Sequence, residues 1–192
     1  MPTEPAAVEL VAAAKVYREG SALQPTNLVL HRGQVHALVG LNGAGKTTLM
    51  RLVLGITAPT AGRVLVRGVD VARMRSAGWA GVGHLIDTPL AYPELTVKAN
   101  LQIAGRLAGL NRADAHAAAL QRILLERVHE AGASVLVSSH HLDEVARIAD
   151  QITVINAGRI IGELALGGFV LERRFFDLVN ADVEAKLLVG KS

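Results

Sequence analysis

A glycine-rich loop between an apolar strand and a helical run constrains the fold more than any other feature of this chain. The nearly continuous apolar run Val35–Val39 predicts a buried strand. The loop that comes after it, Gly40–Thr47, has the spacing G-x-x-x-x-G-K-[ST], and a helical run comes next over Thr48–Leu54. Strand, loop and helix in this order are the context that a phosphate-binding loop, or P-loop, requires.

The residue types in the loop suit a phosphate group. Gly40, Gly43 and Gly45 allow backbone conformations that a Cβ forbids, so successive N–H groups can point inward around an anion. The N-terminus of the helix adds a partial positive charge. We expect Lys46 to reach the β- and γ-phosphates and the Thr47 hydroxyl to ligate Mg²⁺. The alternative is a glycine-rich turn that matches by chance, and the flanking strand and helix argue against it.

Composition narrows the class of protein. A chain of 192 residues with 51% apolar and 19% charged residues predicts one globular domain with a substantial core. The net charge of +3, without a dense basic stripe, argues against nucleic acid as a partner. The chain has no cysteine, which excludes disulfide and zinc–thiolate chemistry. No apolar run is long enough to span a bilayer, so we expect any membrane contact to go through a partner.

Strand and helix patterns alternate along the rest of the chain. Val8–Val16 is compatible with a strand or a short helix. Further strands are predicted at Leu28–Leu30, Arg63–Gly68, Val82–Ile86, Ser134–Ser138 and in a hairpin over Gln151–Ile161 that turns at Asn156–Gly158. Helices are predicted over Val97–Leu107, Asn111–Ala131 and Ser139–Ala149, and the tail Leu171–Leu178 is amphipathic. Tyr17 either packs in the core or stacks on a base, and spacing alone favours neither.

Four stretches together resemble the ATP-binding subunit of ABC transporters. They are Gly40–Leu49, Thr57–Val64, Ser138–Val145 and Ala149–Ile160, which resemble the family's P-loop, the segment after it, the switch region and the segment after the switch. The resemblance covers most of the chain. It implies an α/β fold: a P-loop NTPase core with a mainly parallel sheet, a small antiparallel β layer and a reduced helical subdomain. It also implies an ATP-binding domain over residues 1–165 and a C-terminal helical tail over 166–192.

The resemblance assigns roles to individual residues, with ATP and Mg²⁺ as the expected cofactors. Tyr17 takes the place of the aromatic residue that stacks on adenine, and His140 takes the place of the catalytic switch histidine. Asp87 stands where the family has the Q-loop glutamine, in a loop that looks like the variant of peptide and antibiotic exporters, and we expect it beside Thr47 as a Mg²⁺ ligand. The expected nucleotide-binding residues are Tyr17, Gly40, Asn42, Gly43, Ala44, Gly45, Lys46, Thr47 and Thr48. The alternatives are that Asp87 only begins a turn and that His140 only contacts backbone at a helix start.

Two parts of the family pattern are absent from the sequence. There is no signature loop of the Leu-Ser-Gly-Gly-Gln type, and no apolar strand runs directly into Asp-Glu as a Walker B strand does. Asp143-Glu144 is no substitute, because Ser138–His141 separates it from the strand, and we interpret these acids as surface residues near a helix start. The family comparison predicts an internal deletion near residues 120–128. Mg²⁺ would then lose its usual carboxylate, and no evident base would position the attacking water.

The missing Walker B strand belongs between the switch strand and the Q-loop strand. We therefore expect a gap or re-pairing in the sheet and hypothesise that the isolated chain is marginally stable, which a cooperative melt at ordinary temperatures would contradict. The leading functional prediction is an ATP-binding component of an ABC exporter for a small molecule, peptide or antibiotic. It would lie on the cytoplasmic face of the membrane with a transmembrane permease subunit and, if the dimer closes without the signature, a second ATP-binding subunit. The alternative is a non-catalytic nucleotide-binding module or deletion product; a P-loop kinase or GTPase fits poorly.

Overall fold

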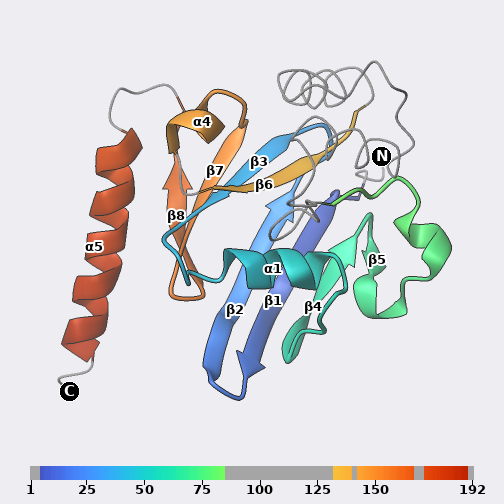
Figure 1. Cartoon of the computed structure of the whole chain (residues 1–192), viewed down its shortest axis with the longest axis horizontal. Coiled ribbons are helices and arrows are strands. Elements are labelled where there is room, and N and C mark those ends of the chain that lie inside the picture. The colour runs from blue at the N-terminus through green and yellow to red at the C-terminus, as the bar shows by residue number, and fades with distance from the viewer. Residues whose placement is uncertain (1–4, 85–131, 140–141, 167–170, 190–192) are drawn as a thin grey trace, which may run out of the picture.

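The computed structural model describes residues 5–84, 132–139, 142–166 and 171–189. In these ranges the strands form two sheets of four strands each, in the orders β2-β1-β4-β5 and β6-β3-β7-β8. Figure 1 shows α1 running across the first sheet and α5 standing beside the strands β7 and β8 of the second. The two sheets and the helices packed on them give the α/β architecture that the sequence predicts.

The first sheet is antiparallel. It contains β1 (Val8–Tyr17), β2 (Gly20–Leu30), β4 (Ala61–Val66) and β5 (Val69–Asp70). The region that the sequence left open between strand and helix is therefore a strand, and it pairs with β2 on one side and β4 on the other. Apolar residues at alternating positions of β1 and β2 are buried, which is the period that a sheet with one covered face requires.

The second sheet is parallel except at one edge. It contains β3 (Val35–Val39), β6 (Val135–Ser139), β7 (Gln151–Asn156) and β8 (Arg159–Leu164). β3 pairs in parallel with β6 and with β7, and β8 runs antiparallel to β7. All five residues of β3 are buried, as expected for a central strand covered on both faces.

The described helices are short except for the last. They are α1 (Lys46–Val53), α4 (Leu142–Ala146), α5 (Leu171–Val189) and the 3₁₀ turns η1 (Val71–Arg73) and η2 (Ser76–Trp79). Within the described ranges no helix is both long enough and apolar enough to cross a membrane.

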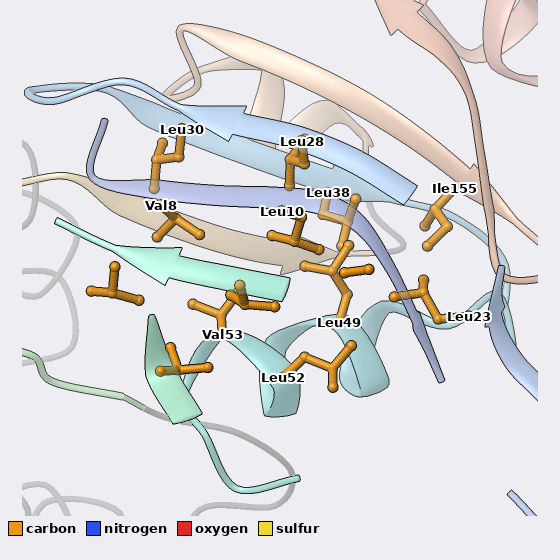
Figure 2. Close-up of a cluster of buried hydrophobic side chains, with 14 of the residues drawn as sticks. Val8, Leu10, Leu23, Leu28, Leu30, Leu38, Leu49, Leu52, Val53 and Ile155 are labelled. Atoms are coloured by element: carbon orange, nitrogen blue, oxygen red, sulfur yellow. The ribbon is translucent and has the colours of Figure 1, made fainter. Parts of the chain in front are cut away.

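Two apolar clusters hold these layers together. In Figure 2, Leu49 of α1 points toward Leu10 of β1 and Leu38 of β3, and Leu52 and Val53 belong to the same buried cluster, so α1 packs against strands of both sheets. The second cluster joins the parallel sheet to the helices α4 and α5. Burying apolar surface stabilises the fold by about 25 cal/mol per Å². Because α1 is anchored in this way, the loop that ends at its first residue is held at that end.

Several sequence predictions are confirmed and some are corrected. The hairpin over Gln151–Ile161 is confirmed with its turn between Asn156 and Arg159. The predicted strand Val82–Ile86 is wrong over residues 82–84, which form neither strand nor helix. The predicted helix start near Lys46 is confirmed, because Gly45 in a left-handed conformation ends the loop there and α1 begins at Lys46. The helices predicted over 97–107 and 111–131, and the deletion near 120–128, lie outside the described residues.

Candidate functional site

Three elements close around the loop that joins β3 to α1. A Cβ built on Gly40 would lie 2.2 Å from the carbonyl oxygen of Ile155 in β7. A Cβ on Gly45 would lie 2.8 Å from the carbonyl oxygen of Ala22 in β2 and 3.2 Å from the Cα atom of Gly158. Contacts this close leave no room for a side chain, so glycine is required at both positions. The loop is thus fixed from outside by β7, by the β7–β8 turn and by β2.

The inner side of the loop offers backbone N–H groups to an anion. Gly43 and Gly45 have φ angles of +78° and +104°, in the left-handed region that side chains disfavour. α1 starts after Gly45 with no side-chain cap and no acidic residue in its first turn. The first N–H groups of a helix have no intrahelical partner, so an uncapped start is free to bind an anion. The loop therefore fits a phosphate group.

Lys46 lies inside the curve of this loop. Its Nζ donates hydrogen bonds to the carbonyl oxygens of Gly40 at 2.7 Å and of Leu41 at 2.9 Å. Partial burial lowers the pKa of Lys46 from its usual value, because the ammonium group loses part of its hydration. A phosphate group would replace neutral carbonyls with charged acceptors, which form stronger hydrogen bonds.

The remaining loop residues differ in exposure. Asn42 and Thr47 are exposed, Thr48 is half-buried, and Ala44 is buried with its N–H donated to Leu41 at 3.1 Å. The exposed Thr47 hydroxyl suits the expected Mg²⁺ contact, and its expected partner Asp87 lies outside the described residues. In the part of the chain that the structure describes, no group of three His, Cys, Asp or Glu side chains is arranged to hold a metal.

Tyr17 lies at the end of β1, in the hairpin that supports the loop. It pairs with Gly20, and Ala22 of the same hairpin is the residue that approaches Gly45. The Tyr17 side chain is 38% exposed, and Lys15 Nζ lies 5.1 Å from the ring centroid. This exposure argues against core packing, one of the two interpretations of Tyr17, and leaves the ring accessible. Stacking on adenine stays a prediction.

The switch side of the site is described only up to β6. Ser138 and Ser139 pair with Leu38 and Val39, so β6 ends beside the start of the P-loop. His140, the expected catalytic residue, lies outside the described residues. Within the described ranges β6 is the last strand of its sheet, and the gap or re-pairing expected beside it stays a prediction.

Sequence reasoning missed three groups that shape the site. The β7–β8 turn supports the P-loop through a hydrogen bond from the Gly158 N–H to the Ala44 carbonyl at 2.8 Å. His36, buried in β3, bonds Thr153 Oγ1 at 2.8 Å. Asp182 on α5 is a buried carboxylate among cations. A histidine inside an apolar strand and an aspartate inside an amphipathic tail are visible in the sequence. Their partners in the sheet, Thr153 for His36 and Asn156 and Arg159 for Asp182, are more than twenty residues away.

Comparison with known proteins identifies the family. The family model described as "ABC transporter" matches residues 23–158, which is more than half of the chain and includes the P-loop. The chain belongs to the ABC transporter family. Its matched region is the ATP-binding part, and its sequence lacks the signature loop and the Walker B strand of that family.

Three curated relatives illustrate the likeness. The bacitracin transport ATP-binding protein BcrA of Enterococcus faecalis is 26% identical, over 91% of this chain and 75% of its own length. The daunorubicin resistance ATP-binding protein DrrA3 of Streptomyces coeruleorubidus is 29% identical, over 82% and 67%. The ribose import ATP-binding protein RbsA of Chelativorans sp. (strain BNC1) is 27% identical, over 93% of this chain but only 47% of the relative.

The alignment with BcrA also bears on the internal length of the chain. It extends over 231 residues, more than the 192 residues of the whole chain, so the relative carries residues there that this chain lacks. Among solved structures, an ATP-binding subunit of an ABC transporter has a TM-score of 0.66 at 23% identity and covers 89% of this chain and 93% of its own. A dimeric bacterial ABC transporter cassette has a TM-score of 0.65 at 18% identity, over 84% and 100%. This likeness shows that the chain has the fold of an ABC ATP-binding cassette.

Proposed function

We propose that this chain binds Mg-ATP through the loop Gly40–Thr47 as the ATP-binding component of an ABC exporter. The observation that carries the proposal is the uncapped start of α1 behind a loop held open from three sides, with Lys46 Nζ inside the curve. This arrangement supplies N–H groups and a cation to the phosphates before any ligand arrives. Preorganised donors lose little conformational freedom on binding, which favours affinity.

Different residues would contact the phosphates, the Mg²⁺ ion and the adenine base. The loop N–H groups of Gly43 and of Gly45 to Thr48 and the Lys46 ammonium would bind the phosphates, and the Thr47 hydroxyl would ligate Mg²⁺ with Asp87. Tyr17 would stack on adenine, and His140 would hydrogen-bond the γ-phosphate. ATP supplies the free energy of a transport cycle in this family. The chain's own part is to hold the phosphates and to pass their state to a partner.

Export is the direction that we propose. Two observations support it: the residues around Asp87 look like the exporter form of this loop, and two of the three relatives named above carry names for bacitracin transport and daunorubicin resistance. The third is named for ribose import, so the names of the relatives support export only together with the loop around Asp87. The substrate class would be a small molecule, peptide or antibiotic. The chain would act at the cytoplasmic face of the membrane through a transmembrane permease subunit, with a second ATP-binding subunit as a further partner.

A non-catalytic nucleotide-binding module is the second candidate. The observation that favours it is the absence from the sequence of an apolar strand ending in Asp-Glu, which removes the usual Mg²⁺ carboxylate and the base for the attacking water. Under this candidate the P-loop binds nucleotide and turnover is negligible. Both candidates share the same binding site and differ only in whether the bound ATP is hydrolysed to drive transport.

One set of assays separates the candidates. Steady-state ATP turnover is measured for the wild type and Lys46→Ala, and accumulation of a labelled peptide antibiotic is measured in cells that express either form. Turnover above background that Lys46→Ala abolishes, together with lower accumulation in wild-type cells only, supports the exporter. Background turnover and equal accumulation in both kinds of cell would contradict it and leave the binding module.

A further inference from the structure

The structure assigns a positioning role to Asp182 on α5: through the β7–β8 turn it holds the P-loop in its binding conformation. This inference rests on the proposed nucleotide site and adds to it a residue far along the chain from the loop. Figure 1 shows α5 beside β7 and β8. Asp182 is connected to the loop by a short series of hydrogen bonds through the β7–β8 turn.

The first step is the environment of the Asp182 carboxylate. Its side chain is only 4% exposed, and a buried charge is costly unless it is paired and hydrogen-bonded. Asp182 Oδ2 accepts hydrogen bonds from Asn156 Nδ2 at 3.0 Å and from Lys186 Nζ at 2.7 Å, and Oδ1 pairs with the Arg159 guanidinium. We call these four residues the Asp182 clamp. Lys186 belongs to α5 itself, so Asn156 and Arg159 are the partners that join the helix to the sheet.

The second step is where those two partners lie. Asn156 is the last residue of β7 and Arg159 is the first residue of β8. Between them Ala157 and Gly158 have φ angles of 46° and 75°, both in the left-handed region. A two-residue turn of this kind is strained at Ala157, because a residue with a Cβ disfavours the left-handed region. The clamp therefore holds both ends of a turn in which Ala157 adopts a disfavoured backbone conformation.

The third step joins the turn to the P-loop. The Gly158 N–H donates to the Ala44 carbonyl at 2.8 Å, and the Gly158 carbonyl accepts from the Gln24 N–H at 2.7 Å. The Gln24 side chain donates to the Ala157 carbonyl at 3.3 Å. The backbone of the turn therefore bonds the P-loop and β2, while its two flanking side chains bond Asp182. A shift of the turn would move the backbone that fixes Ala44 and Gly45.

The consequence is a dependence of nucleotide affinity on α5. Without the carboxylate, Asn156 and Arg159 lose their common partner, and the turn is free to relax toward conformations that Ala157 prefers. The P-loop would then lose part of its preorganisation and bind Mg-ATP more weakly, although Asp182 touches no nucleotide. A purely structural role, in which Asp182 only attaches α5, predicts the same loss of stability without this specific loss of affinity.

The test compares two variants of α5. Asp182→Ala removes the clamp, whereas Val179→Ala removes a buried apolar contact of the same helix and leaves the clamp in place. Mg-ATP affinity is measured by equilibrium titration below the melting temperature of each variant, and exchange of the Gly158 N–H is followed by NMR. We expect Asp182→Ala to weaken binding about tenfold and to speed Gly158 exchange, and Val179→Ala to change affinity less than about twofold.

Two further variants keep the test decisive. If Asp182→Ala does not fold, Asn156→Ala breaks the same clamp at the turn and keeps the pairing of α5 with Arg159. Asp182→Asn keeps an acceptor for Asn156 and is expected to recover part of the affinity. Equal loss of affinity in Asp182→Ala and Val179→Ala, or unchanged affinity and exchange in both clamp variants, overturns the inference. If the wild type binds no Mg-ATP the proposed function fails, and the Gly158 exchange rate still decides whether Asp182 holds the turn.

Discussion

β3 and β6 are neighbours in one sheet and are buried very differently. They pair in parallel from Val35 with Val135 to Val39 with Ser139. Every residue of β3 is buried, whereas every residue of β6 is only half-buried. β3 has a paired strand on each side, and β6 is the last strand of its sheet within the described residues. Among the described residues, the strand that carries the phosphate loop is therefore buried and paired on both sides, whereas the strand that leads to the switch is half-buried and paired on one side.

The groups that would bind phosphate and the groups that would hydrolyse it therefore depend on different strands. The P-loop depends on β3, β7, the β7–β8 turn and β2, all of which are described and packed around it. The hydrolytic groups of the family would come after β6 and its missing neighbour, and the sequence lacks the carboxylates for them. The two halves of the site therefore need not fail together, and single substitutions in each half can test that separation.

The largest effect is expected at Gly40, where β3 meets the loop. A Cβ there would lie 2.2 Å from the Ile155 carbonyl oxygen, so Gly40→Ala should cost at least ~3 kcal/mol of unfolding free energy or prevent folding. Gly43→Ala is the matched control, because nothing lies within 4 Å of its Cβ and only the φ of +78° is unfavourable. We expect about 1 kcal/mol there, from urea denaturation of both variants. Equal costs would contradict the close packing at Gly40.

A smaller difference is expected between Val35→Ala and Val135→Ala, at two positions that face each other across the pair. Val35 is 3% exposed and Val135 is half-buried. Truncation should cost about 2 kcal/mol in β3 and about 1 kcal/mol or less in β6, since less apolar area is lost there. Urea denaturation measures both. A larger cost in β6 would mean that this strand is covered as well as its neighbour.

Tyr17 should affect affinity and leave stability nearly unchanged. Its ring is exposed, so Tyr17→Ala should weaken Mg-ATP binding about fivefold by removing a stacking surface worth about 1 kcal/mol. Tyr17→Phe keeps the ring and should bind within about twofold of the wild type. Fluorescence titration with a labelled ATP analogue distinguishes them. Identical affinities for all three proteins would remove Tyr17 from the site.

The smallest expected effect is a pH dependence that originates in β3. Burial lowers the pKa of His36 below the 6.5 of the unfolded chain, against a raising influence from Glu163 and a lowering one from His31. The unfolded chain therefore takes up a proton that the folded chain refuses, so stability is full above pH 6.5 and falls as the pH drops below it. Thermal melts between neutral and mildly acid pH measure this. The paired replacement of His36→Leu and Thr153→Val should flatten that part of the profile; an unchanged slope would assign it elsewhere.

Features formed by residues that are contiguous in the chain could be predicted from the sequence. The spacing from Gly40 to Thr47 and the apolar strand before it are contiguous, so they predict the P-loop and its flanking elements directly. The hairpin turn at Asn156–Gly158 is equally local. Val82–Ile86 misled because its apolar residues fit a strand by pattern, whereas residues 82–84 form none in the structure. Short apolar runs carry no information about the neighbour that a strand needs.

The supports of the site are non-local, and the sequence does not reveal them. The contact of Gly45 with Ala22, the bond between Ala44 and Gly158, and the pairing of Asp182 with Asn156 join segments that are far apart in the chain. The sequence shows such a group only as a polar residue in an apolar pattern, such as an aspartate on a helix that packs by its apolar face or a histidine in an apolar strand. Their partners are determined by the fold.

The most direct test of the separation between binding and hydrolysis is equilibrium binding of Mg-ATP to the purified chain, with Lys46→Ala alongside. We predict that the wild type binds and that Lys46→Ala loses at least ~100-fold in affinity, because the ammonium in the P-loop is the main charge available to the phosphates. Both proteins should give the same circular dichroism spectrum. Absence of binding by a folded wild-type chain, or equal binding by both proteins, would contradict the claim that the P-loop binds nucleotide without the signature loop and the Walker B strand.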